Sequence, residues 1–214
     1  MPRDVKPRSY HSRLREERAA GTRRRILVAT AALLEQKGYA ATTVATIARR
    51  AGVSVDTVYT SVGRKPELVL AVVDDILGGA DGPVPVEQRD YVVAMRAAAG
   101  AAEKLETYAA AVARLLPRLA PLVVALTRAA EEDPACRKAR RRLDERRAQN
   151  MLLLAADLRA TGELRDDLDD ATVADLIWST NAVEYFLLLQ GRGWTPERYG
   201  TVLADVWSRT LLAR

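Results

Sequence analysis

Residues 43–61 read TVATIARRAGVSVDTVYTS, and this stretch decides the fold of the N-terminal part of the chain. Thr43 is a good N-cap for a helix over residues 44–51, because its hydroxyl accepts a hydrogen bond from the first helical turn. Ser54 occupies the same position before residues 55–61. The pattern therefore predicts two short helices that follow each other closely.

The residues between these two helices predict a sharp, well-packed turn. Ala48 is small enough for two helices to approach closely, and Gly52, four residues later, permits the backbone conformation of a tight turn. Val53 and Val58 supply apolar anchors that pack the second helix onto Ile47. This is the spacing of a helix-turn-helix, whose short second helix is stabilised by docking and fits the major groove of DNA.

Helical patterns continue on both sides of this motif. An apolar stripe at helical spacing predicts a helix from about residue 13, which ends at Lys37–Gly38 with a cation and a helix-stopping glycine. Pro66 opens a further helix to about Leu77, since proline is tolerated in a first turn. Residues 78–83, GGADGP, form the clearest linker of the chain.

The remainder of the chain is also expected to be helical and shows no strand-like alternation. Gly100, Pro117, Pro134 and Gly162 separate its helical stretches, and Thr195 and Pro196 resemble an N-cap and a first-turn residue. The expected helices cover residues 86–98, 101–116, 118–132, 135–161, 171–190 and 196–212. The predicted fold class is all-α.

Positive charge is concentrated in the first third of the chain. The whole chain has a net charge of +5, and residues 1–66 hold 14 Lys and Arg against 5 Asp and Glu. Such an asymmetry is typical of a polyanion-binding module attached to a neutral or acidic body.

The composition argues against several other classes of protein. Cys136 is the only cysteine and His11 the only histidine, so an internal disulfide, a metal site or a haem site is not expected. No apolar run approaches the roughly 20 residues that span a bilayer, and the basic N-terminus lacks the apolar core of a signal peptide. We therefore expect a cytoplasmic protein without a cofactor.

The run from Ile26 to Leu68, ILVATAALLEQKGYAATTVATIARRAGVSVDTVYTSVGRKPEL, resembles the DNA-binding domain of the TetR/AcrR family of transcription regulators. The resemblance is closest at a set of short motifs: Gly38–Tyr39, Thr42–Thr43, Ile47–Ala48, Ala51–Ser54, Tyr59 and Lys65–Leu68. It covers about 45 residues, and the rest of the chain resembles the family in being helical and of typical length.

The resemblance implies a division of the chain and a function. It implies a disordered basic arm over residues 1–12, a helix-turn-helix domain over 13–65, a connecting helix and linker over 66–82, and a regulatory and dimerisation domain over 83–214. A homodimer, formed through the last two helices, would bind double-stranded DNA at a palindromic operator. A repressor of this kind would leave the operator when a small molecule binds its C-terminal domain.

The resemblance also assigns roles to single residues of the motif. Thr43 would bind a phosphate through its hydroxyl or its amide, and Lys65 would bind another at the start of the next helix. Three residues would lie at the reading end of the second helix: Val55, Asp56 and Thr57. Tyr59 and Thr60 would contact the DNA backbone and thymine methyl groups.

Three positions depart from what the motif leads us to expect. Val62 stands where the family usually has phenylalanine, which keeps an apolar anchor but removes volume. Val55 and Asp56 are poor donors to guanine, so specificity could rest on thymine methyl contacts, an Asp–cytosine contact or DNA shape. The operator sequence is left open.

The predicted C-terminal domain offers polar residues set among apolar ones as candidates for a ligand pocket: Tyr108, Arg114, Asn150, Trp178, Asn181 and Tyr185. Trp178, Asn181 and Tyr185 would share one face of the helix over 171–190. The same stripe would serve equally well as core or as dimer interface. The basic run RKARRRLDERR, residues 137–147, is expected to be a solvated helix face with its acidic neighbours as partners.

Two rival functions remain at this stage. An enzyme would need activated groups, and the sequence contains no placed histidine, metal set, glycine-rich phosphate loop or nucleophile motif. A helical ligand-sensing module with a vestigial DNA-binding end would be favoured by Val62 and by the poor donors Val55 and Asp56. Weak, salt-insensitive DNA binding would support that second rival.

Overall fold

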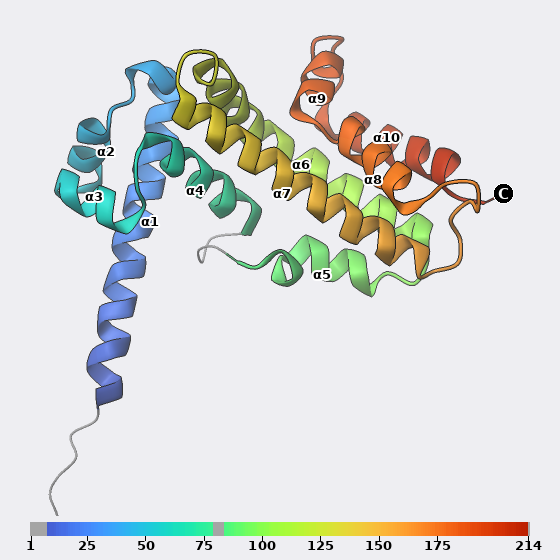
Figure 1. Cartoon of the computed structure of the whole chain (residues 1–214), viewed down its shortest axis with the longest axis horizontal. Helices are drawn as coiled ribbons and strands as arrows, with labels where there is room; N and C mark the ends of the chain where they lie inside the picture. The colour runs from blue at the N-terminus through green and yellow to red at the C-terminus, as the bar shows by residue number, and fades with distance from the viewer. Residues whose placement is uncertain (1–7, 79–83, 214) are drawn as a thin grey trace, which may run out of the picture. The chain divides into compact units, whose positions relative to one another are not determined.

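The computed structural model describes residues 8–78 and 84–213, with side chains from residue 15 onward, and the regular structure of this part of the chain is helical throughout, as predicted. Figure 1 shows the order of the helices. They are α1 (Arg8–Ala41), α2 (Val44–Ala51), α3 (Val55–Ser61), α4 (Lys65–Gly78), the short 3₁₀ helix η1 (Val86–Gln88), α5 (Asp90–Ala97), α6 (Ala101–Ala129), α7 (Pro134–Arg159), α8 (Asp170–Thr180), α9 (Val183–Gln190) and α10 (Pro196–Leu211).

The chain divides into two compact units, one ending at Val72 and the other beginning at Val73. The division falls inside α4. Leu68, near the start of α4, packs into the core of the N-terminal unit, whereas Val73 and Leu77 line a cavity of the C-terminal unit. The two units are therefore described separately.

The long helix α1 has an irregularity where the sequence predicts its end. Gly38 has φ 73° and ψ 177°, which interrupts the helix before one further turn to Ala41. At the other end, α1 begins at Arg8 and includes residues 8–12 of the expected disordered arm. Residues 1–7 of that arm lie outside the described residues.

The core of the N-terminal unit is small and joins α1, α2, α3 and the start of α4. Its buried members are Ile26, Ala29, Leu33, Ile47, Ala48, Ala51, Val58 and Leu68. Val53 and Val62 are partly buried and pack against this cluster. Both predicted anchors, Val53 and Val58, therefore pack as expected, and Val62 retains the apolar contact that its position requires.

The longest helix of the C-terminal unit, α6, corrects a prediction. We expected a break at Pro117, but α6 continues through both Pro117 and Pro121. The two prolines are exposed, whereas Leu116 and Ala120, which directly precede them, are buried in the core. Burial of these apolar neighbours offsets the cost of about 3 kcal/mol for each proline inside a helix.

Helix α6 is also longer and more apolar than the sequence analysis expected. Among the described helices it alone is long and apolar enough to cross a membrane, with a mean hydropathy of 1.7 over 18 residues. Its buried side chains belong to the core that α6 shares with α7 and α10. This burial identifies α6 as the central core helix of the C-terminal unit.

The expected single helix over residues 171–190 is in fact two helices. Helix α8 ends at Thr180, and Ala182 has extended backbone (φ −70°, ψ 148°) before α9 begins. The carbonyl of Thr180 accepts a hydrogen bond from the hydroxyl of Tyr199 at 2.6 Å, so this acceptor is taken by a side chain rather than by the helix. In Figure 1, α9 accordingly runs in a different direction from α8.

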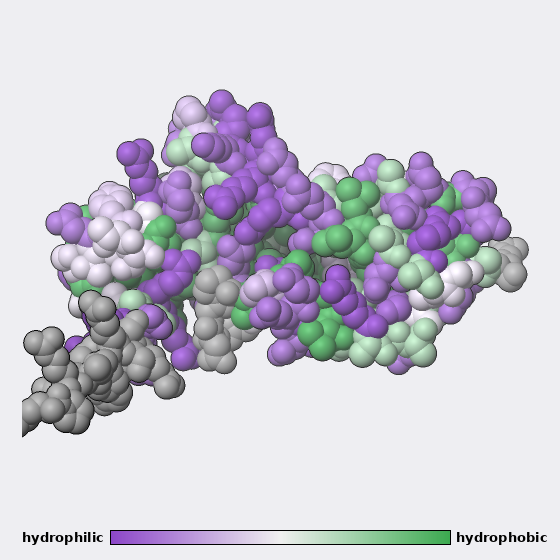
Figure 2. All heavy atoms as spheres, turned by 60° about the horizontal axis from the view of Figure 1, so that its bottom comes forward, coloured by the Kyte–Doolittle hydropathy of each residue, from purple (hydrophilic) through white to green (hydrophobic). Residues whose placement is uncertain are grey.

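The apolar stripes of the last helices are largely turned into the core of the same molecule. Ile177, Val183, Tyr199, Leu203 and Trp207 are all buried there. The hydrophobic residues that α9 and α10 leave exposed are Leu188 and Val206. On the face drawn in Figure 2, the C-terminal unit shows separate hydrophobic patches among polar side chains.

Candidate nucleic-acid interface and ligand cavity

The turn between α2 and α3 has the geometry that the sequence predicts. Gly52 lies in the left-handed region, with φ 67° and ψ 40°. The amide of Val53 donates to the carbonyl of Ala48 at 3.0 Å, and the amide of Gly52 donates to the carbonyl of Arg49 at 3.3 Å. These two bonds form a Schellman motif, which ends α2 and starts the chain toward α3.

The N-terminus of α2 is closed by a reciprocal pair of threonines. The hydroxyl of Thr43 accepts from the amide of Thr46 at 3.1 Å, and the hydroxyl of Thr46 accepts from the amide of Thr43 at 3.0 Å. The resemblance assigns the hydroxyl or the amide of Thr43 to a phosphate, and both groups already form hydrogen bonds with Thr46 in the cap. A phosphate contact by Thr43 would use its hydroxyl proton, which points to Thr46 at 3.2 Å.

Helix α3 presents a continuous face to solvent. Val55 and Tyr59 are 37% and 47% exposed, and Asp56 and Thr60 beside them are exposed as well. Asp56, Tyr59 and Thr60 follow Val55 by one, four and five residues, which places all four on one side of the helix. Val58 on the opposite side is fully buried, so docking of α3 leaves the predicted reading residues free.

Thr57, unlike the other residues predicted to contact bases, forms hydrogen bonds within the helix cap. Its amide donates to the side-chain oxygen of Ser54 at 3.0 Å, and the two hydroxyls lie 2.7 Å apart. Thr57 is also only half exposed. The residue therefore belongs to the cap of α3 as well as to its N-terminal turn.

Basic residues near α3 have different roles in the structure. The ammonium group of Lys65 lies 3.8 Å from the centre of the Tyr39 ring, which orients this cation at the start of α4. Arg23 donates to the carbonyl of Ser61 at 2.8 Å and so holds the end of α3 against α1. Arg24 and Arg25 are exposed.

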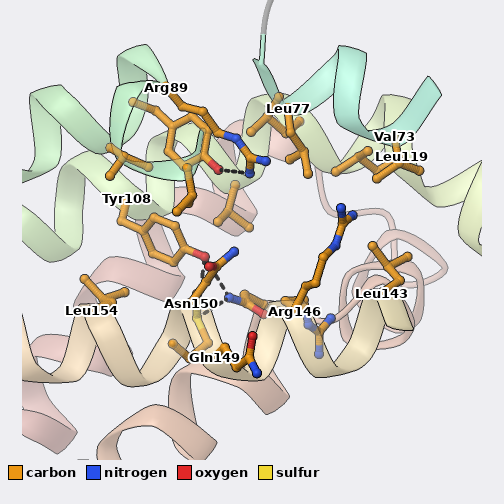
Figure 3. Close-up of a pocket in the computed structure, with 18 of the residues that line it drawn as sticks. Val73, Leu77, Arg89, Tyr108, Leu119, Leu143, Arg146, Gln149, Asn150 and Leu154 are labelled. Atoms are coloured by element: carbon orange, nitrogen blue, oxygen red, sulfur yellow. Dashed lines mark hydrogen bonds between the residues drawn. The ribbon is translucent and has the colours of Figure 1, made fainter. Parts of the chain in front are cut away.

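The C-terminal unit contains a cavity of about 570 Å³, which is within the size range of sites for drug-sized ligands. Most of its wall is apolar, with side chains from α4, α5, α6 and α7. Figure 3 shows Arg89 and Tyr108 entering the cavity from one side, with Arg146 and Asn150 on α7 across from them.

The structure brings together three of the predicted pocket residues, because Tyr108, Asn150 and Asn181 all line this cavity. Trp178 and Tyr185 do not. The break after Thr180 destroys the single helix face that was expected to join them to Asn181. Trp178 instead lies under the guanidinium of Arg147 at 4.4 Å, and Tyr185 packs against Tyr199 with ring centroids 6.3 Å apart.

Tyr108 and Asn181 form a buried polar pair with Met151. The amide nitrogen of Asn181 donates to the hydroxyl of Tyr108 at 3.1 Å, and that hydroxyl donates to the sulfur of Met151 at 3.5 Å. Burial raises the pKa of the Tyr108 hydroxyl well above its ordinary value. Tyr108 is therefore neutral at physiological pH and available as a hydrogen-bonding group beside the cavity.

The sequence analysis missed the charged residues of the cavity. The expected solvated face of residues 137–147 holds for Arg137, Arg141 and Arg142, which are exposed. It is wrong for the arginines that are partly buried along the cavity, Arg140, Arg146 and Arg147. A signal existed for Arg147, because it lies four residues after Leu143 on the predicted apolar stripe. Arg89, also missed, has no such signal.

The titratable residues of the described chain form no metal centre, since no group of three or more His, Cys, Asp or Glu side chains comes together there. Cys136 is fully buried, as expected for a small core residue. The described residues of the two units therefore contain no cluster of side chains that would bind a metal ion.

Comparison with known proteins gives a family match for the N-terminal unit and a similar fold for most of the chain. Residues 26–72 match the model of the tetR family of bacterial regulatory proteins. None of the curated proteins matches the chain by sequence.

Solved structures of similar fold cover nearly the whole chain. The fatty acid degradation regulator FadR from Bacillus halodurans has a TM-score of 0.69 at 16% identity, covering 90% of this chain and 97% of that chain. NalD of Pseudomonas aeruginosa, the secondary repressor of a multidrug efflux pump, has 0.67 at 21%, covering 91% and 98%. A putative transcriptional regulator from Saccharomonospora viridis, solved with choline, has 0.64 at 18%, covering 90% and 98%.

Proposed function

We propose that the chain is a DNA-binding repressor of the tetR family of bacterial regulatory proteins, whose model matches residues 26–72. In this proposal a homodimer binds a palindromic operator in the cytoplasm and is released by a small molecule bound in the C-terminal cavity. The observation that carries the proposal is the exposed face of α3, held on a tight helix-turn-helix.

Reading of the operator is assigned to Val55, Asp56, Thr57, Tyr59 and Thr60 on α3. The exposure of Val55 and Tyr59 supports this assignment, because both side chains are accessible to a DNA groove. Their methyl and ring groups suit contacts with thymine methyl groups. Thr43 and Lys65 flank α3 and are assigned to phosphates, which position the helix without reading sequence.

Dimerisation is assigned to the last two predicted helices, residues 171–190, which form α8 and α9, and residues 196–212, which contain α10. Most of their apolar residues are buried in the core of the molecule, but Leu188 remains 68% exposed and Val206 38% exposed. A second copy would remove both from water. Two recognition helices about 34–36 Å apart would then face successive major grooves of a palindromic site.

Ligand release is assigned to the cavity of the C-terminal unit, with Tyr108, Asn150 and Asn181 as polar residues of the site. Trp178 and Tyr185 lie outside its wall and are proposed to support it by packing. By linkage, a ligand that weakens DNA binding is itself bound more weakly by the DNA-bound protein, by the same factor.

The test is selection of bound duplexes from a randomised DNA pool, with the wild-type chain, Lys65→Ala and Tyr59→Ala. We expect a palindromic consensus for the wild type and loss of enrichment for both variants. Arg142→Ala, which removes an exposed arginine from the C-terminal unit, is the matched control and should recover the same consensus. Binding no stronger than background at moderate salt would contradict the proposal and favour a ligand-sensing module with a vestigial DNA-binding end.

A further inference from the structure

The charged side chains around the cavity are not evenly paired. Arg140 forms ion pairs with Asp144 and with Glu184, the latter at 2.9 Å. Arg146 pairs with Asp74 at 2.8 Å. The two acidic residues of the cavity wall, Asp74 and Asp144, are thus already neutralised by arginines.

Arg89 is the deepest of the remaining cations. The residue is only 9% exposed, and its guanidinium donates a hydrogen bond to the hydroxyl of Tyr91 at 3.3 Å. The Nε atom is buried and has no hydrogen-bond partner among the described residues. None of the ion pairs in the described part of the chain includes Arg89, so its charge lies in the cavity wall without a carboxylate.

Arg147, on α7, is a partly buried arginine that likewise has no ion pair among the described residues. It donates to the carbonyl of Trp178 at 2.9 Å and stacks on the Trp178 ring, but it too makes no ion pair within the described ranges. Its Nε atom is buried and unpartnered there. Burial lowers the pKa of Arg147, while the nearby carboxylates of Asp144 and Glu184 act in the opposite direction.

Arg89 is buried and Arg147 partly buried, each without an ion pair among the described residues, and a bound anion would stabilise both. An arginine keeps its charge in a protein, so burial without a counter-ion costs free energy that an incoming anion would recover. The planar fork of a guanidinium also matches the two oxygens of a carboxylate. A cation would meet the opposite situation, because both acidic residues of the wall are already paired.

The rest of the wall defines the other end of the ligand. Side chains such as Val92, Met95, Leu116, Leu119 and Leu154 surround the space and offer no polar partner. We infer that the cavity binds an amphipathic organic anion, whose carboxylate is held by Arg89 with Arg147 adding positive charge and whose apolar body lies against this wall. The inference rests on the proposed function, in which this cavity is the effector site.

The experiment compares three probes with the same ten-carbon chain and different head groups: decanoate, 1-decanol and decyltrimethylammonium. Calorimetric titration of the full chain, without DNA, should give decanoate an affinity at least tenfold higher than 1-decanol. Decyltrimethylammonium should bind most weakly. A cavity that selects only for apolar surface would bind decanoate and 1-decanol equally, and that result would overturn the inference.

Variants locate the effect at Arg89. Arg89→Met should lower decanoate affinity to that of 1-decanol and leave 1-decanol binding unchanged, whereas Arg89→Lys keeps the charge and should retain a preference for decanoate. Arg142→Met, at an exposed position of α7, is the matched control and should behave as the wild type. Thermal unfolding of each variant confirms that the chain is folded.

The outcomes also separate this inference from the proposed function. Preference for the cation, or no binding of any probe, overturns the anion site even if the operator selection succeeds. Decanoate selectivity that depends on Arg89 supports it even if no operator is found, because binding is measured on the free protein.

Discussion

At the scale of single residues, the C-terminal unit depends on a few buried polar groups that satisfy one another. Thr180 is the clearest example. Its carbonyl accepts from the hydroxyl of Tyr199, and its hydroxyl accepts from the indole nitrogen of Trp207 at 2.7 Å. One threonine therefore satisfies the polar atoms of two large aromatic side chains, each of which is 1% exposed.

Lys104 has a similar role at the end of α5 and yields a prediction about stability. Its ammonium group donates to the carbonyl of Arg96 at 2.9 Å and to that of Met95 at 3.4 Å, and it forms an ion pair with Asp157 at 3.3 Å. Lys104→Met would leave these acceptors without their donor. We expect the free energy of unfolding to fall by about 1–3 kcal/mol.

Denaturant unfolding followed by tryptophan fluorescence measures this effect, since Trp178, Trp194 and Trp207 all lie in the C-terminal unit. Lys138→Met, at an exposed position of α7, is the control and should change stability little. Equal stability of the Lys104 variant and the wild type would show that water replaces the lost donor.

At the scale of elements, the closest helix packing is between α6 and α10. A Cβ added at Gly200 of α10 would lie 2.8 Å from the Cβ of Ala113 and 3.3 Å from the carbonyl oxygen of Ala109, both on α6. This close approach buries Tyr199, Leu203 and Trp207 against the central helix. Gly200 is thus needed for the contact and not for a turn.

Gly200→Ala should therefore destabilise the C-terminal unit although alanine favours a helix. The gain in helix propensity is about 1 kcal/mol, whereas overpacking costs about 1–3 kcal/mol together with a shift of α10. The matched control is Gly191→Ala, where the added Cβ would meet its nearest atom at 3.4 Å in ordinary contact. Tryptophan-detected melting should show a lower Tm for Gly200→Ala alone, and an unchanged or higher Tm would contradict the packing argument.

At the scale of the whole molecule, the chain combines a basic N-terminal part with an acidic remainder. Residues 67–214 hold 19 Lys and Arg against 23 Asp and Glu, so the charge that attracts DNA belongs to the part that contains α2 and α3. The exposed apolar residues of α9 and α10 belong to the other unit. The residues assigned to DNA binding and those assigned to dimerisation thus lie in different units.

DNA binding should depend steeply on salt for this reason. Each neutralised phosphate contributes a slope of about −0.9 to a plot of log K against log salt concentration. Lys65→Ala should make the slope shallower by roughly 2 in a homodimer, one phosphate for each protomer. Fluorescence anisotropy with the selected operator between low and moderate salt measures the slope, and an unchanged slope would remove Lys65 from the phosphate contacts.

Dimerisation can be tested at one exposed leucine. Leu188→Glu places a charge in the proposed interface on α9 and should shift the chain toward monomer in analytical ultracentrifugation. It should also weaken binding to a full palindrome more than to a half-site. Val93→Glu, which changes a 52% exposed valine on α5, should stay dimeric. A dimer that survives Leu188→Glu but not Val93→Glu would move the interface to α5.

The sequence by itself determined the all-α class, the helix-turn-helix and its caps, because these signals are local. Thr43, Gly52 and Ser54 act on backbone groups within a few residues of themselves, so their effect can be read from spacing alone. The resemblance of residues 26–68 to the family rests on the same local pattern.

Tertiary structure decided the features that depend on distant residues. Helix α8 ends at Thr180, whose carbonyl accepts a hydrogen bond from Tyr199, 19 residues away, and α6 passes Pro117 because its neighbours are buried by other helices. Tyr108, Asn150 and Asn181 were found as polar residues among apolar ones, but Arg89 and Arg147 were not. Their burial without an ion pair among the described residues arises only when α5, α6 and α7 enclose the same cavity, which no local pattern records.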